Sequence, residues 1–275
     1  MSDLQVRQEP LRIVPTAVAT RPWRALGGKA SLHLVERHAR VYRHLWLMLA
    51  SGIAEPLFYL LSIGVGLGRL VPTVGGVSYA AYVAPALLAT SAMNGAIYDS
   101  TFSVFFLIKY AKTYDAALAT PMRAQDLALG QVLWALIRSA IYALAFTVVM
   151  LAMGLFHSYW AIGVLPAAVL TGFAFSAAGM AATTFMRSWQ DFEFVTLVSV
   201  PLFLFSATFF PLSVYPPAIA VVVRCTPLYQ AVALMRGLAL GAVGPGLLWH
   251  VAYLAIMGLV GLYIAGRRVE RLLLT

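Results

Sequence analysis

Long apolar stretches separated by short polar segments constrain this chain more than any other feature of its sequence. A helix needs about 20 apolar residues to cross the roughly 30 Å of hydrocarbon in a bilayer. Six stretches approach or exceed this length, and they cover residues 45–67, 80–107, 127–154, 161–186, 194–212 and 246–265. The sequence therefore predicts an all-α integral membrane protein with six transmembrane helices.

The balance of apolar and charged residues agrees with this fold class. Hydrophobic residues make up 61% of the chain and charged residues only 11%, whereas an average soluble domain has about 25% charged residues. A single cysteine, Cys225, excludes an intramolecular disulfide and a metal site built from cysteines. We interpret it as a small apolar filler.

Basic residues gather on one side of the predicted membrane. With the N-terminus in the cytosol, the cytosolic parts hold 15 lysines and arginines, the outer parts hold three, and one arginine lies inside a span. The positive-inside rule selects this orientation, which predicts a multi-pass protein of the bacterial inner membrane with both termini in the cytosol. The basic residues form no continuous face interleaved with aromatics, so no nucleic-acid partner is expected.

The distribution of polar segments divides the chain into four parts. We expect a flexible cytosolic tail over residues 1–30, an amphipathic interfacial helix over 31–45, the six-span domain over 46–266 and a cytosolic tail over 267–275. In the interfacial helix, apolar residues recur at helical spacing while Arg37 and Arg40 occupy other faces. These arginines suit anionic lipid head groups, but the same face also suits contact with a partner protein.

Residues 214–245 are too broken to form another full crossing. They contain two apolar pieces, 218–223 and 228–240, separated by prolines and arginine. Each piece is shorter than the roughly 17 residues that a crossing requires. We therefore expect short re-entrant helices in the outer leaflet between the fifth and sixth spans.

Three charged residues lie inside the predicted spans, namely Glu55, Asp99 and Arg138. An unpaired charge in mid-bilayer costs about 3 kcal/mol or more, and the helical rise places all three at similar depths. We predict that Arg138 neutralises Glu55 or Asp99. The pair would act as a structural clamp, although direct contact with a substrate stays open. Pro56 follows Glu55 and favours a kink there.

No catalytic motif is present in the sequence. Residues 27–31 resemble the end of a phosphate-binding loop, but Trp23 stands where a glycine is required and Ala30 where Ser or Thr is required. The histidines are scattered and form no metal-binding pair. We therefore expect no catalytic residue, no metal and no cofactor bound by this chain, which is not predicted to be an enzyme.

A short polar and aromatic segment joins the second and third spans on the cytosolic side. It covers residues 109–126 and reads as a helix that ends at Pro121. Such a helix suits docking of a soluble partner, whereas the alternative is an ordinary solvated loop.

Four segments carry a resemblance to a known family. The sequences EPLFYLLSIGVGLGRLV (55–71), YVAPALLATSAM (82–93), KTYDAALATPM (112–122) and FFPLSVYPPAIAVVVRCTPLYQAVALMRGLALG (209–241) resemble the type-2 ABC exporter permeases, particularly their nodulation protein J branch. The resemblance extends over residues 32–270.

The resemblance implies a transport permease that works with partners. It implies a homodimer, or a heterodimer with a similar permease, in contact with membrane lipid, and two copies of a separate ATPase subunit that bind ATP and Mg²⁺. Coupling to this ATPase would involve Lys109, Lys112, Tyr114, Asp115, Pro121 and Arg123, together with Arg37 and Arg40 of the interfacial helix. Substrates of the family include lipid-linked oligosaccharides, glycolipids and drugs, and the nodulation branch exports lipo-oligosaccharides.

The expected mechanism is alternating access with a substrate path at the dimer interface. Phe203, Phe205, Phe209 and Phe210 offer an aromatic surface for this path, or alternatively pack against lipid or the protein core. A competing hypothesis is a proton-coupled secondary transporter that uses Glu55 and Asp99, although no internal repeat is visible. An intramembrane enzyme is a third alternative, but His250 has no evident partner.

Overall fold

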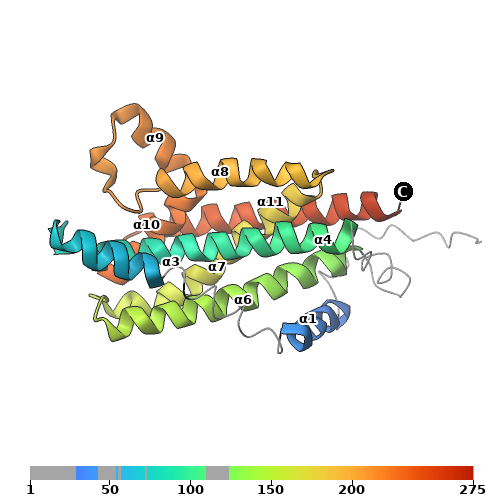
Figure 1. The fold of residues 1–275 in the computed structure, drawn as a ribbon, viewed down its shortest axis with the longest axis horizontal. Helices are drawn as coiled ribbons and strands as arrows, with labels where there is room; N and C mark the ends of the chain where they lie inside the picture. Colours follow the sequence, from blue (N-terminus) through green and yellow to red (C-terminus); the bar gives the residue numbers. More distant parts are fainter. Residues whose placement is uncertain (1–28, 43–53, 55–56, 72, 110–123, 275) are drawn as a thin grey trace, which may run out of the picture.

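A computed structural model describes residues 29–42, 54, 57–71, 73–109 and 124–274. Four helices in it are long and apolar enough to cross a membrane. They are built around α3 (Tyr79–Tyr98), α6 (Ala124–Ala152), α7 (Val164–Thr183) and α11 (Gly246–Leu274). The first of them continues through the π-helical segment η3 (Asp99–Ser103) into α4 (Val104–Lys109), and the third begins at η4 (Tyr159–Gly163). Figure 1 shows the four helices side by side along the longest axis of the molecule.

Helix α7 is the central element, because it packs against α3, α6 and α11. Small residues permit this close approach, as is usual between membrane helices. At Gly261 of α11, an added Cβ atom would lie 2.7 Å from the carbonyl carbon of Ala177 in α7. Side chains larger than hydrogen therefore cannot be accommodated there without moving one of the two helices.

The first predicted span is described only in part. An apolar helical stretch runs from Leu57 to Arg69 and contains η1 (Leu60–Gly66) and η2 (Leu67–Arg69). It leads into a small antiparallel hairpin of β1 (Thr73–Val74) and β2 (Val77–Ser78), whose turn uses Gly75 and Gly76 at φ 60° and 85°. Left-handed backbone of this kind favours glycine. The rest of the predicted span, including Glu55, lies outside the described residues.

The fifth predicted span is shorter than expected. Helix α8 (Phe192–Leu204) ends at Leu204, whereas the apolar pattern predicted helix to residue 212. The Ser206 hydroxyl donates to the Phe203 carbonyl at 3.0 Å and also bonds Thr208 Oγ1 at 2.6 Å. Such local bonds from serine and threonine side chains compete with helix formation. The hydrophobic pattern alone did not reveal this stop.

The two short helices predicted between the fifth and sixth spans are present. They are α9 (Pro217–Cys225) and α10 (Pro227–Leu240), and their axes differ by 85°. Thr226 caps α10 by accepting a hydrogen bond from the Tyr229 amide, and Pro227 occupies the first turn, where a missing amide hydrogen costs nothing. Counted as one broken crossing, the pair would raise the number of membrane-capable helices from four to five. The six-span count thus stays a prediction.

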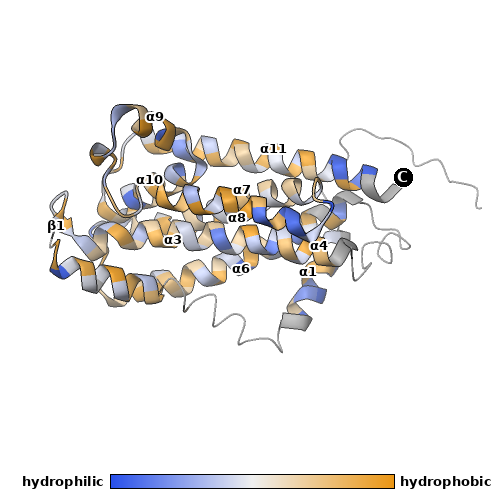
Figure 2. Ribbon diagram, turned by 45° about the horizontal axis from the view of Figure 1, so that its top comes forward, coloured by the Kyte–Doolittle hydropathy of each residue, from blue (hydrophilic) through white to orange (hydrophobic). Residues whose placement is uncertain are grey.

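Helix α1 (Lys29–Tyr42) corresponds to the predicted amphipathic helix and packs against α6. Leu34 is buried at this contact, while Arg37 and Arg40 are exposed. The apolar side of α1 is therefore covered by protein at Leu34, and its location at a membrane interface stays a prediction. Figure 2 shows hydrophilic residues on α1 and toward the C-terminal end of α11, with hydrophobic residues along the helices between the two ends of the molecule.

Candidate functional site

An ion pair between Asp99 and Arg138 joins two of the long helices in the interior. Asp99 is the first residue of the π-helical segment after α3, and Arg138 lies in α6. Arg138 Nη1 donates to Asp99 Oδ1 at 2.5 Å, and its Nη2 donates to the Tyr142 hydroxyl at 2.8 Å. The Arg138 side chain is only 9% exposed and the Asp99 side chain only 5%. Mutual neutralisation of this kind offsets the cost of placing each charge in an apolar medium.

Polar contacts around the ion pair extend to the central helix. Thr183 of α7 donates a hydrogen bond to the Ser100 carbonyl at 3.0 Å. The Ser100 and Thr101 hydroxyls donate back to the carbonyls of Ala96 and Ile97 at 2.7 Å each. Back-bonding of this type loosens regular helix and coincides here with the π-helical segment. The ion pair thus joins the end of α3 to α6, and the Thr183–Ser100 hydrogen bond joins the same segment to α7. A role for the pair as a structural clamp stays a prediction.

One of the two partners that were predicted for Arg138 lies within the described residues. Asp99 is the partner in the structure, while Glu55 lies outside the described residues and a role for it stays a prediction. Asp99 and Arg138 lie close enough to form the pair that helical rise indicated, and their depth in a membrane stays a prediction.

The predicted coupling residues fall mainly outside the described residues. Lys109 is the last residue of α4, whereas Lys112, Tyr114, Asp115, Pro121 and Arg123 belong to the segment 110–123, which the structure does not describe. Arg37 and Arg40 extend from α1, where the Arg40 guanidinium binds Glu36 at 2.5 Å and lowers the pKa of that carboxyl group. Helix α1 rests on the first turns of α6, because Leu34 meets Gly130. The two arginines therefore lie on an element next to the start of α6.

The four phenylalanines of the predicted substrate path divide into two pairs. Phe203 and Phe209 contact each other with ring centroids 5.2 Å apart and pack against the main hydrophobic core. Phe205 and Phe210 are 46% and 52% exposed. The structure thus assigns a packing role to Phe203 and Phe209, and leaves the other two available for contact with lipid, a second subunit or a substrate.

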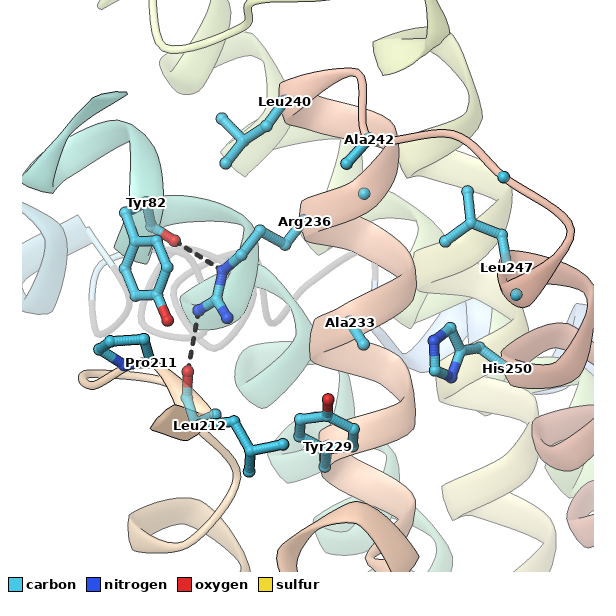
Figure 3. A pocket seen from close by; sticks show the side chains of 14 residues that line it. Tyr82, Pro211, Leu212, Tyr229, Ala233, Arg236, Leu240, Ala242, Leu247 and His250 are labelled. Atoms are coloured by element: carbon cyan, nitrogen blue, oxygen red, sulfur yellow. Dashed lines mark hydrogen bonds between the residues drawn. The ribbon is translucent and has the colours of Figure 1, made fainter. Parts of the chain in front are cut away.

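A pocket of about 440 Å³ lies where α10, the first turn of α3, the start of α11 and the segment after α8 meet. Among its lining residues are Tyr82, Leu212, Tyr229, Arg236 and His250. Figure 3 shows Arg236, Tyr82 and Tyr229 on one side of α10 and His250 on the other. This pocket was not predicted from the sequence, in which Arg236 counts only among the three basic residues of the predicted outer parts. An arginine inside an otherwise apolar helical piece was the signal that could have indicated it.

Arg236 is held in the pocket wall by backbone carbonyl groups. Its Nε donates to the Tyr82 carbonyl at 3.1 Å, and its Nη2 donates to the carbonyls of Ala207 and Thr208 at 2.9 and 3.3 Å. The guanidinium carbon lies 3.8 Å from the centroid of the Tyr82 ring, a distance suited to a cation–π interaction. Ala207 has a positive φ of 57°, a strained backbone conformation that presents its carbonyl to Arg236. Within the described part of the chain, no carboxylate lies within 4.0 Å of this guanidinium.

His250 is positioned by the opposite side of α10. Gln230 Nε2 donates to the Arg224 carbonyl at 2.5 Å, which leaves Gln230 Oε1 to accept a hydrogen bond from His250 Nδ1. This donor assignment places the lone pair of the neutral imidazole on Nε2. His250 thus has a partner in the structure, which the sequence did not reveal, but no nucleophile accompanies it among the residues named at this pocket.

Comparison with known proteins identifies the family of the chain. Residues 31–240 match the family described as ABC-2 type transporter. The chain belongs to this family. The match includes the ion pair, the bent helices α9 and α10, and Arg236.

Individual relatives of this ABC-2 transporter chain are nodulation proteins and a transport permease by name. Nodulation protein J of Rhizobium leguminosarum bv. trifolii is 34% identical over 82% of this chain and 87% of its own length. Nodulation protein J of Rhizobium meliloti (strain 1021) is 31% identical over 82% of this chain and 86% of its own length. The inner membrane transport permease YadH of Escherichia coli (strain K12) is 25% identical over 64% of this chain and 69% of its own length. The chain is thus a multi-pass transport permease of the inner membrane, a class of component that is not itself an enzyme.

Proposed function

We propose that this chain is the membrane-spanning subunit of an ATP-driven exporter that moves an amphipathic substrate outward from the cytosolic side. The substrate class is a lipid-linked oligosaccharide, a glycolipid or a drug. The observation that carries the proposal is the family match over residues 31–240, together with the similarity to nodulation protein J over 82% of the chain.

The energy source in this proposal is a separate ATPase subunit, present in two copies, which binds ATP and Mg²⁺. Permeases of the ABC-2 family normally work with such a subunit. The proposed docking region comprises the segment 109–123 and the exposed arginines of α1. The contact between α1 and α6 supports this choice of docking region, because α1 packs beside the turns of α6 that directly follow the segment. An ATPase that touched one of these elements would also reach the other.

A second copy of the permease, or a similar permease, completes the proposed translocation path. Helix α8 contains no buried residue, although it is strongly apolar. Its exposed large hydrophobic side chains are Phe194, Leu197, Val198, Val200 and Leu204. Such a helix needs lipid or another protein around it, and the segment that follows it carries the two exposed phenylalanines, Phe205 and Phe210.

In the proposed alternating-access cycle, the ATPase pair moves the coupling segments and thereby shifts the two permease copies. The Asp99–Arg138 clamp would make α3, α6 and α7 move together. The competing proton-coupled mechanism draws less support, because Arg138 already occupies Asp99 Oδ1.

Co-purification and reconstitution test the proposal. The ATPase that is encoded beside this chain, or the ATPase of a nodulation protein J system, is co-expressed with it and reconstituted in vesicles. We expect a stable complex whose ATP hydrolysis rises when an acylated oligosaccharide is added. Changing Lys112, Asp115 and Arg123 together to alanine should remove both the complex and the stimulation. Retention of both by the triple variant would exclude the coupling segment, and transport without any ATPase would exclude the proposed energy source.

A further inference from the structure

The pocket beside α10 has a wall that combines one cation with aromatic and aliphatic groups. Arg236 supplies the charge, Tyr82 and Tyr229 supply phenol groups, and Leu212 and Leu240 supply apolar surface. A pocket of about 440 Å³ falls within the roughly 300–1,000 Å³ range of small-molecule sites. Its size and lining are therefore those of a ligand site for a polar group attached to an apolar one.

The charge on Arg236 is fixed in place but is not neutralised by a carboxylate within the described residues. The carbonyls of Tyr82, Ala207 and Thr208 satisfy Nε and Nη2. The other terminal nitrogen, Nη1, takes no part in the hydrogen bonds to these three carbonyls. An oriented guanidinium with a remaining donor prefers an oxyanion, since charge-assisted hydrogen bonds to phosphate or carboxylate are short and strong.

The helices that form the pocket indicate that its ligand is an amphiphile and not a small soluble anion. Helices α3 and α11 belong to the set that is long and apolar enough to cross a membrane, and α10 packs against both of them. A head group bound at Arg236 would therefore have apolar helix surface beside it for its acyl chain. The phenol groups of Tyr82 and Tyr229 can donate to the same oxygen atoms as the guanidinium.

We propose that the Arg236 pocket binds the anionic head group of an amphiphile, with the guanidinium contacting its phosphate, sulfate or carboxylate oxygens. The head group belongs either to a bilayer lipid or to a transported molecule, since both present the same chemistry. The site goes beyond the proposed export function and requires no ATPase for binding.

Binding of matched lipids to the full-length chain tests the site. The purified chain in a neutral detergent is titrated with dioctanoyl phosphatidylglycerol or dioctanoyl phosphatidylcholine, and native mass spectrometry counts the bound lipid. We expect phosphatidylglycerol to bind about tenfold more tightly, as one charge-assisted hydrogen bond of about 1.4 kcal/mol provides. Equal binding of the two lipids would overturn the proposal.

Variants test whether a preference for phosphatidylglycerol arises at this pocket. Arg236→Gln should remove the preference, and Arg236→Lys should restore part of it. Because Arg236 also supports three carbonyl groups, Ala233→Phe provides an independent test, since it fills the pocket from α10 and keeps the arginine. Arg224→Gln is the matched control, as it removes an exposed outer arginine that does not line the pocket. A preference that survives Ala233→Phe, or that disappears in Arg224→Gln, would overturn the assignment.

A transport measurement separates the two sources of the head group. The chain and its ATPase are reconstituted in vesicles that contain fluorescent phosphatidylglycerol. Outward movement that depends on ATP and on Arg236 identifies the head group as cargo, and tight binding without movement identifies it as a resident lipid. Both results support the site. Failure of the ATPase to assemble would count against the proposed function alone, because the binding titration uses the permease by itself.

Discussion

Arg138 of α6 reaches Asp99 at the end of α3 and Tyr142 one turn further along its own helix, so a single guanidinium links two helices in the protein interior. The two partners in this ion pair are chemically unequal. A buried carboxylate can bind a proton when its partner is lost, whereas an arginine cannot release one under ordinary conditions.

This inequality predicts that Asp99→Asn destabilises the protein more than Arg138→Gln. We expect Asp99→Asn to cost about 3–5 kcal/mol, the usual loss when one partner of a buried ion pair is removed, and Arg138→Gln to cost less. The double variant should recover much of the loss, because neither charge remains. The stabilities of the variants are compared by thermal unfolding in detergent, followed with a fluorescent dye that does not react with thiols. Equal losses in the two single variants, or no recovery in the double variant, would contradict the clamp.

The ion pair also shows how much of the structure the sequence could predict. The depths of Asp99 and Arg138 follow from residue counting along a helix of fixed rise, so their meeting was accessible to sequence reasoning. The pair of short helices α9 and α10 was accessible too, because Pro216, Pro217 and Pro227 mark their starts. In each case the information is local, or depends only on helix geometry.

The Arg236 pocket depends on tertiary contacts that no local pattern contains. Its arginine is oriented by carbonyl groups from α3 and from the segment after α8, which are far apart in the sequence. The early end of α8 is likewise absent from the hydropathy pattern, since it follows from hydrogen bonds of the Ser206 hydroxyl to the Phe203 carbonyl and to Thr208 Oγ1 within a strongly apolar run. Hydropathy measures neither effect, which explains why the predicted fifth span was too long.

Helix α1 should attach more weakly to the bundle in acid. His38 stacks on Trp134 of α6 with ring centroids 5.6 Å apart, and burial lowers the pKa of His38 from its ordinary 6.5, with the nearby charges of Arg37 and Arg138 acting in the same direction. The folded state therefore prefers neutral His38. Stability from this contact is fully present above pH 6.5 and is lost as the pH falls below that value toward the lowered pKa.

The pH dependence can be assigned to this residue by substitution. The midpoint of thermal unfolding, measured from pH 7.5 to about pH 5.5, should fall more for the wild-type chain than for His38→Phe, which keeps the ring contact without a titrating group. His33→Gln is the control, because His33 is an exposed histidine on the same helix. If His38→Phe and the wild-type chain show parallel curves, the contact does not respond to pH.

Gly261 should tolerate no side chain. Because an added Cβ would lie 2.7 Å from Ala177 C, Gly261→Ala should cost about 1–3 kcal/mol through overpacking between α7 and α11. Gly246→Ala in the same helix has nothing within 4 Å of the added atom and should be nearly neutral. The stability of both variants is measured by thermal unfolding. A neutral Gly261→Ala would show that the two helices can separate freely.

The exposure of α8 makes the subunit arrangement testable by cross-linking. Leu197 is 67% exposed on α8, and Leu259 is 59% exposed on α11, so each can carry a cysteine at an accessible apolar position. The natural thiol is first removed by Cys225→Ala, since Cys225 is the only cysteine. If two copies meet along α8, oxidation of Leu197→Cys in native membranes should give a disulfide-linked dimer on a denaturing gel, while Leu259→Cys should give much less. Dimers from Leu259→Cys alone would indicate that the interface lies along α11. Dimers from neither position would favour a different permease as the second subunit.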